Sequence, residues 1–78
     1  MRLLNEDTDT SFSRLTLLLT KSEASELKDT LESILRSPSR HEHVPSEDYE
    51  KEITVAIYDE ANVSAFNERC QHLIRADK

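Results

Sequence analysis

The chain has 78 residues, a formal net charge of −6 and no glycine. Average usage of about 7% would give about five glycines, and their absence excludes phosphate loops, dinucleotide-binding fingerprints and nucleophile elbows, which all need backbone that a Cβ blocks. A chain of this length forms one domain at most and buries only about 60% of its unfolded surface, so self-association would supplement its small core.

The charge balance and the cysteine content limit the partners and the compartment. Acidic residues outnumber basic ones by 16 to 10, and no stripe of basic residues with interleaved aromatic residues is present, which disfavours nucleic acid and anionic lipid as partners. The single cysteine, Cys70, cannot form an intramolecular disulfide. No apolar run reaches the length of a signal peptide or a membrane span. We expect a cytoplasmic protein that binds neither nucleic acid nor a membrane.

The first eleven residues show no periodicity, which predicts a flexible tail over residues 1–11 and a single domain over residues 12–78. The next segment, residues 12–20, alternates between apolar and polar side chains. Its strongest apolar positions are Leu15, Leu17 and Leu19. Alternation with a period of two is typical of a strand that buries one face, so we predict a first strand over residues 12–20.

Residues 21–37 change to helical spacing, because their apolar side chains recur every three or four positions. Thr20 and Glu23 fit a capping box, in which the threonine oxygen accepts the N–H of the third helical residue and the glutamate reaches back. Pro38 ends this predicted helix. A second amphipathic helix is predicted to begin at the N-cap Asn62 and to close the chain.

Between the two helices we predict a hairpin rather than a long acidic loop. Its strands cover residues 40–44 and 49–59, and residues 45–48 form a four-residue turn that begins with proline. The predicted cross-strand pairs are Val44 with Tyr49, His43 with Glu50, Glu42 with Lys51, and His41 with Glu52. Three of these pairs are charge-complementary when the imidazoles are protonated, and a slip by one residue is the main alternative.

Together these elements predict an α+β fold of order β-α-β-β-α, in which two helices pack on one face of a small three-stranded sheet. The first strand lies beside the return strand of the hairpin, which we favour, or at the outer edge of the hairpin. The predicted core consists of Leu15, Leu17, Leu19, Leu27, Leu31, Ile34, Leu35, Ile53, Val55, Ile57, Val63, Phe66, Cys70, Leu73 and Ile74.

The opposite face of this predicted sheet carries more apolar side chains than a solvated face needs. Its candidate interaction residues are Phe12, Leu18 and Tyr58. Aromatic and apolar anchors in a polar surround are typical of protein interfaces. We therefore interpret the chain as a small acidic accessory or protein-interaction module that forms a homodimer or binds a protein partner.

The tripeptide His41-Glu42-His43 is the main candidate for site chemistry. On a strand both imidazoles lie on one face, and the predicted register places Glu50 and Glu52 beside them, which indicates a site for a divalent metal ion. Ordinary surface complementarity explains the same residues. A third interpretation is a pH-responsive patch that loses its pairing above about pH 6.5.

Patterns typical of catalysis are missing from the sequence. Cys70 and His72 lie two residues apart on a predicted helix, about 200° around its axis, and cannot act as a pair, so Cys70 is interpreted as a small buried hydrophobic residue. No serine has an activating neighbour, and the core is too small to enclose a pocket of about 300 Å³. We expect a non-catalytic protein without a cofactor or a small-molecule substrate.

Overall fold

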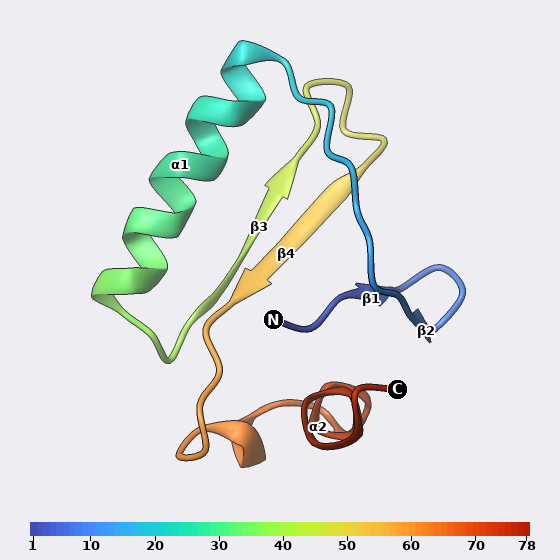
Figure 1. The fold of residues 1–78 in the computed structure, drawn as a ribbon. Helices are drawn as coiled ribbons and strands as arrows, with labels where there is room; N and C mark the ends of the chain where they lie inside the picture. The colour runs from blue at the N-terminus through green and yellow to red at the C-terminus, as the bar shows by residue number, and fades with distance from the viewer. The chain divides into compact units, whose positions relative to one another are not determined.

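The computed structural model describes residues 1–78 and contains two α-helices and two antiparallel sheets of two strands each (Figure 1). The predicted α+β class is confirmed, whereas no three-stranded sheet is present. The chain divides into two compact units, described separately below: the helix–hairpin unit, Leu18–Tyr58, and the terminal unit, Met1–Leu17 with Asp59–Lys78. Neither helix combines the length and the apolar composition that crossing a bilayer requires.

The helix–hairpin unit begins with α1, Lys21–Arg36, whose predicted capping box is confirmed. The hydroxyl of Thr20 accepts the N–H of Glu23 at 3.2 Å, and the Glu23 carboxylate accepts the N–H of Thr20 at 2.9 Å. Ser37 is the C-cap, and its N–H makes the last helical bond, to the carbonyl of Ser33; the helix ends there because Pro38 has no N–H to continue it. The local sequence signals therefore place both ends of α1.

Two strands, β3 (His41–Pro45) and β4 (Glu52–Ala56), complete this unit, and α1 packs against β3 (Figure 1). Its most buried apolar side chains are Ile34 on α1 and Val44 on β3, each only 3% exposed. These two residues mark the centre of a small core between the helix and the hairpin.

The hairpin is present, but its register differs by four residues from the predicted one. Val44 lies opposite Ile53 rather than Tyr49. The observed pairs are His41 with Ala56, Glu42 with Val55, His43 with Thr54, Val44 with Ile53, and Pro45 with Glu52. The predicted pairs of His43 with Glu50, of Glu42 with Lys51 and of His41 with Glu52 are therefore wrong.

Side-chain burial explains the observed register. It places the β-branched side chains of Val44 and Ile53 opposite each other on the face of the hairpin that α1 covers. Burial of such a side chain contributes about 1.5–3 kcal/mol, whereas an exposed ion pair contributes about 0–1 kcal/mol. A shift by an even number of residues keeps every side chain on its predicted face, so Ile53 and Val55 remain on the inner face.

Ser46 fixes the position of the turn. Its N–H donates to the carbonyl of Lys51 at 2.8 Å, and its hydroxyl accepts the N–H of Lys51 at 3.0 Å and donates to the carboxylate of Asp48. The loop thus has the predicted four residues but covers residues 47–50 instead of 45–48.

Three residues have a left-handed backbone conformation in this chain without glycine. Asp9 has φ 55°, Tyr49 has φ 59° and Asp77 has φ 56°. A short polar side chain tolerates this region, whereas a bulky one disfavours it. The hairpin loop therefore carries backbone strain at Tyr49.

The predicted first strand is not present, because residues 14–20 have no regular secondary structure. A period of two shows that a segment suits a strand, but only hydrogen bonds to a neighbour make it one, and β3 and β4 pair only with each other. The leucines of the segment are exposed as a result.

This difference changes the core. Ile34, Val63 and Leu73 are buried as predicted, and Val44 is buried although it was not predicted to be. The predicted core positions Leu15, Leu17, Leu19, Leu31 and Leu35 are exposed instead. The remaining predicted positions are half-buried: Leu27, Ile53, Val55, Ile57, Phe66, Cys70 and Ile74.

In the terminal unit, residues predicted as a tail form a short hairpin of β1 (Leu4–Asn5) and β2 (Thr10–Ser11). The side-chain oxygen of Asn5 accepts the N–H groups of Asp7 and Thr8 at 3.0 and 3.3 Å. This is an Asx turn, in which a side chain replaces a backbone acceptor, and it lets the hairpin close without glycine.

The second helix begins later than predicted. Val63–Ala65 form a single 3₁₀ turn, η1, and α2 covers Glu68–Ala76. The side chain of Asn62 does not cap η1. Asn67 is the N-cap of α2, and its side-chain oxygen accepts the N–H of Cys70 at 2.8 Å. Both asparagines satisfy the cap preference, so sequence alone did not distinguish them.

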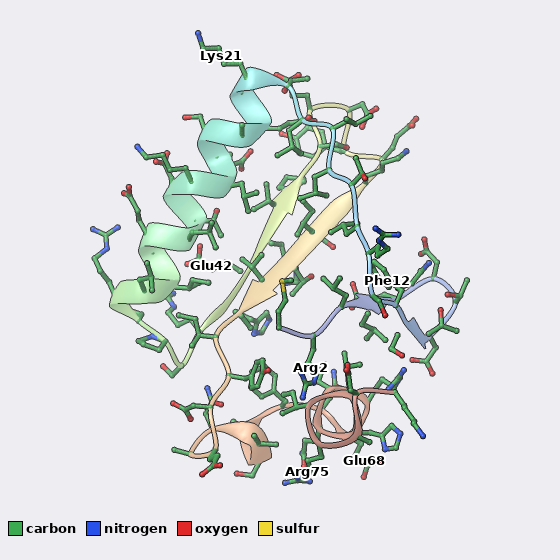
Figure 2. All side chains as sticks on the ribbon, viewed as in Figure 1. Arg2, Phe12, Lys21, Glu42, Glu68 and Arg75 are labelled. Carbon is green, nitrogen blue, oxygen red and sulfur yellow. The ribbon has the colours of Figure 1, made fainter.

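Two arginines join the N-terminal hairpin to α2. Arg2 donates to the carbonyls of Leu73 and Ile74, both at 3.2 Å, and Figure 2 shows its side chain reaching toward α2. Arg69 donates to the carboxylate of Asp9 at 2.7 Å. Arg2 thereby satisfies carbonyls near the C-terminus of α2, where a cation also interacts favourably with the helix dipole.

Candidate functional site

The histidine face is the exposed side of the β3–β4 hairpin. Successive side chains of a strand alternate between faces, so the residues on this side are those that α1 does not cover. They are His41, His43, Pro45, Glu52, Thr54 and Ala56. Every one of them except Pro45 is exposed. The face is therefore accessible to an ion or a partner from solution.

Two imidazoles lie side by side on this face. The ring centroids of His41 and His43 are 5.3 Å apart, and the ring planes cross at 84°. Nδ1 of His43 lies 2.8 Å from the hydroxyl oxygen of Thr54 and 3.4 Å from a carboxylate oxygen of Glu52. One nitrogen of His43 thus has two polar neighbours on the adjacent strand.

The structure places three of the four residues predicted to bind metal on one face of the hairpin. His41, His43 and Glu52 share the histidine face, whereas Glu50 lies in the loop because the register is shifted. No group of three or more histidine, cysteine, aspartate or glutamate side chains is arranged to hold a metal ion. The two histidines are the part of the predicted ligand set that does not depend on the register.

The predicted interaction residues have different environments. Leu18 is 91% exposed, whereas Phe12 and Tyr58 are half-buried. None of the three lies in a strand, so the sheet face predicted to present them does not form. Leu18 instead belongs to a run of exposed leucines, which we call the leucine segment and which comprises Leu15, Leu17, Leu18 and Leu19.

The inner side of the hairpin carries a polar contact that sequence analysis missed. The hydroxyl of Ser33 on α1 donates to the carboxylate of Glu42 on β3 at 2.8 Å, and both residues are half-buried. The sequence contains a signal for this contact: Glu42 lies two residues before Val44 on the strand, so both side chains lie on the inner face. Glu42 holds the helix against the strand and is not part of the histidine face.

Two carboxylates have lowered pKa values, both because of hydrogen bonds. The backbone N–H of Thr20, and then that of Glu47, lowers the pKa of Glu23. The hydroxyl of Ser46, and then the N–H of Glu50, lowers the pKa of Asp48. Hydrogen bonds to the charged form favour it, so both groups stay ionised and hold the hairpin loop.

Cys70 is half-buried on α2, and His72 is exposed on the same helix. The features that remain available for function are thus the histidine face and the leucine segment. No family model matches the chain, and no curated protein and no solved structure matches it either.

Proposed function

We propose that the protein is a small acidic, non-catalytic interaction module of the cytoplasm that forms a homodimer through the leucine segment. One observation carries the proposal: Leu15, Leu17, Leu18 and Leu19 are 53%, 44%, 91% and 38% exposed. The four leucines lie within five consecutive residues, and exposed apolar patches on soluble proteins mark association sites.

The free edge of β4 supports this proposal by offering a backbone partner. Ser46 donates its N–H to the carbonyl of Lys51, so these two residues form a hydrogen-bonded pair. Hydrogen-bonded and non-hydrogen-bonded pairs alternate along an antiparallel hairpin, so every second pair beyond this one is also hydrogen-bonded. The N–H and C=O groups of Glu52, Thr54 and Ala56 consequently point away from β3. An added strand would pair with these groups.

The leucine segment has the alternation that such an added strand needs. We infer that residues 12–20 of one copy add to the edge of β4 in the other copy, which gives each sheet three strands. Two equivalent contacts then form around one two-fold axis, and each buries one leucine segment. A closed dimer of this kind also removes both exposed sheet edges at β4.

Paired substitutions test this proposal by sedimentation velocity at tens of micromolar. Leu17→Asp should convert the dimer to monomer, because Leu17 shares the apolar face of the added strand with Leu15 and Leu19, and the charge would lie in the buried contact. Leu35→Asp is the matched control, since Leu35 is 69% exposed but lies on α1, and it should leave the dimer intact. A wild-type chain that sediments only as a monomer, or equal dissociation by both variants, would overturn the proposal.

A further inference from the structure

We propose that His41 and His43 chelate one divalent ion of a late first-row metal, Zn²⁺ or Cu²⁺, on the histidine face, while Glu52 orients the ring of His43 through its Nδ1. This ligand set differs from the one that the sequence predicts, because neither Glu50 nor Glu52 binds the ion. It lies on β3 and β4 alone and does not depend on the leucine segment or on dimer formation.

The separation of the two rings suits a shared ion. A ligating imidazole nitrogen lies about 2.0–2.1 Å from Zn²⁺ and about 1.1 Å from its ring centre, so two imidazoles on a tetrahedral ion have centroids about 5.2 Å apart. The observed separation is 5.3 Å. Both side chains are exposed, so rotation about their side-chain torsions can direct one nitrogen of each toward an ion between them.

The neighbours of His43 assign its two nitrogens. Nδ1 lies next to Thr54 and Glu52, which leaves Nε2 as the nitrogen that faces an ion. Metal-bound histidines usually make this arrangement, with a hydroxyl, carbonyl or carboxylate on the second nitrogen that fixes the ring and raises its basicity. Glu52 thus acts through His43, since its carboxylate lies 3.4 Å from Nδ1 and not on the nitrogen that binds the ion.

The donor set determines which ions bind. Two imidazoles favour Zn²⁺ and Cu²⁺ over Mg²⁺ and Ca²⁺, which require oxygen ligands, and Cu²⁺ should bind more tightly than Zn²⁺. Because only two imidazoles come from the protein, water completes the coordination. The affinity should therefore be much weaker than that of a closed structural site with four protein ligands.

The test is calorimetric titration of the full chain with ZnCl₂ at pH 7.4, together with NMR spectra of the imidazole protons. We expect one ion per chain, with shifts at His41 and His43 and not at His72 on α2. His41→Ala should lower the affinity by at least about tenfold, and Glu52→Gln should lower it by about tenfold. Circular dichroism of each variant checks that the fold is retained, and His41, which is exposed, can be changed without loss of packing.

The matched controls are His72→Ala and Glu50→Gln, both of which should leave the affinity unchanged. Absence of binding at millimolar Zn²⁺, or an affinity that survives His41→Ala, would overturn the proposed site. Equal effects of Glu50→Gln and Glu52→Gln would restore the four-ligand set that the sequence predicts and would contradict the assignment to Glu52.

Discussion

The carboxylate of Glu23 accepts the backbone N–H of Glu47 at 2.8 Å and so joins residues that are 24 positions apart in the chain. Its other oxygen accepts the N–H of Thr20 at 2.9 Å. One side chain therefore caps α1 and also holds the hairpin loop next to the start of that helix. This double role makes Glu23 the residue that best connects the local sequence signals to the tertiary structure of the helix–hairpin unit.

Removal of the Glu23 carboxylate should destabilise this unit in a graded way. Glu23→Ala removes both hydrogen bonds, whereas Glu23→Gln keeps one acceptor oxygen and should lose less. Glu26→Gln, an exposed change on the same helix, should have almost no effect. Urea unfolding followed by circular dichroism measures this order, and equal midpoints for Glu23→Ala and Glu26→Gln would contradict it.

The helix signals could be read from the sequence because they are local. Thr20 and Glu23 are three residues apart, and their geometry is set by the helix itself. The contacts of Arg2 with Leu73 and of Arg69 with Asp9 could not be predicted in this way, since they join residues 71 and 60 positions apart. Sequence patterning indicates which side chains are polar, but it does not indicate which distant carbonyl they reach.

The candidate site could be predicted in part for a related reason. The alternation of side chains along a strand places both imidazoles, those of His41 and His43, on one face whatever the register. The choice of carboxylate required the pairing of β3 with β4. That pairing depends on burial of Val44 against Ile53, whereas the charge pattern around the turn favoured a different register. In the same way, the alternation within residues 12–20 indicates a strand but does not identify the strand with which it would pair.

Acidic pH should weaken the helix–hairpin unit. The pKa values of Glu23 and Asp48 are lowered from 4.5 and 3.8 by their hydrogen bonds. Their stabilisation is therefore fully present above these ordinary values and is lost as the pH falls through the lower values of the folded state. Urea midpoints measured between pH 6 and pH 2 should fall below about pH 4.5. If the Glu23 carboxylate contributes as described, the urea midpoint of Glu23→Gln should fall by less than that of the wild type. A wild-type midpoint that is unchanged at pH 3 would contradict this explanation.

Tyr49→Gly should stabilise the protein by about 0.5–1 kcal/mol. Tyr49 has φ 59°, a conformation that costs an ordinary residue about 1–2 kcal/mol and glycine almost nothing, although the greater flexibility of unfolded glycine offsets part of the gain. Its side chain is 82% exposed, so little packing is lost. Tyr49→Ala is the control, because it removes the ring but keeps the Cβ. Thermal unfolding should show a gain for glycine alone, and an equal gain for alanine would refute backbone strain as the cause.

Arg69→Ala should destabilise the terminal unit by about 1 kcal/mol or more, because it removes charge-assisted hydrogen bonds to Asp9 and to the carbonyl of Lys78. The Arg69 side chain is only 24% exposed. Arg75→Ala is the matched control on the same helix, since Arg75 is exposed and donates only to Gln71. Amide hydrogen exchange of α2 should accelerate in the first variant and not in the second. Equal exchange in both variants would mean that the link to Asp9 contributes nothing to α2.

The most direct test of dimer formation through the leucine segment is an isotope-filtered NMR experiment on a refolded equal mixture of labelled and unlabelled chains. We expect intermolecular NOEs between the methyl groups of the leucine segment and the side chains of β4. Intermolecular NOEs that involve other surfaces only, or none at concentrations of several hundred micromolar, would contradict the account.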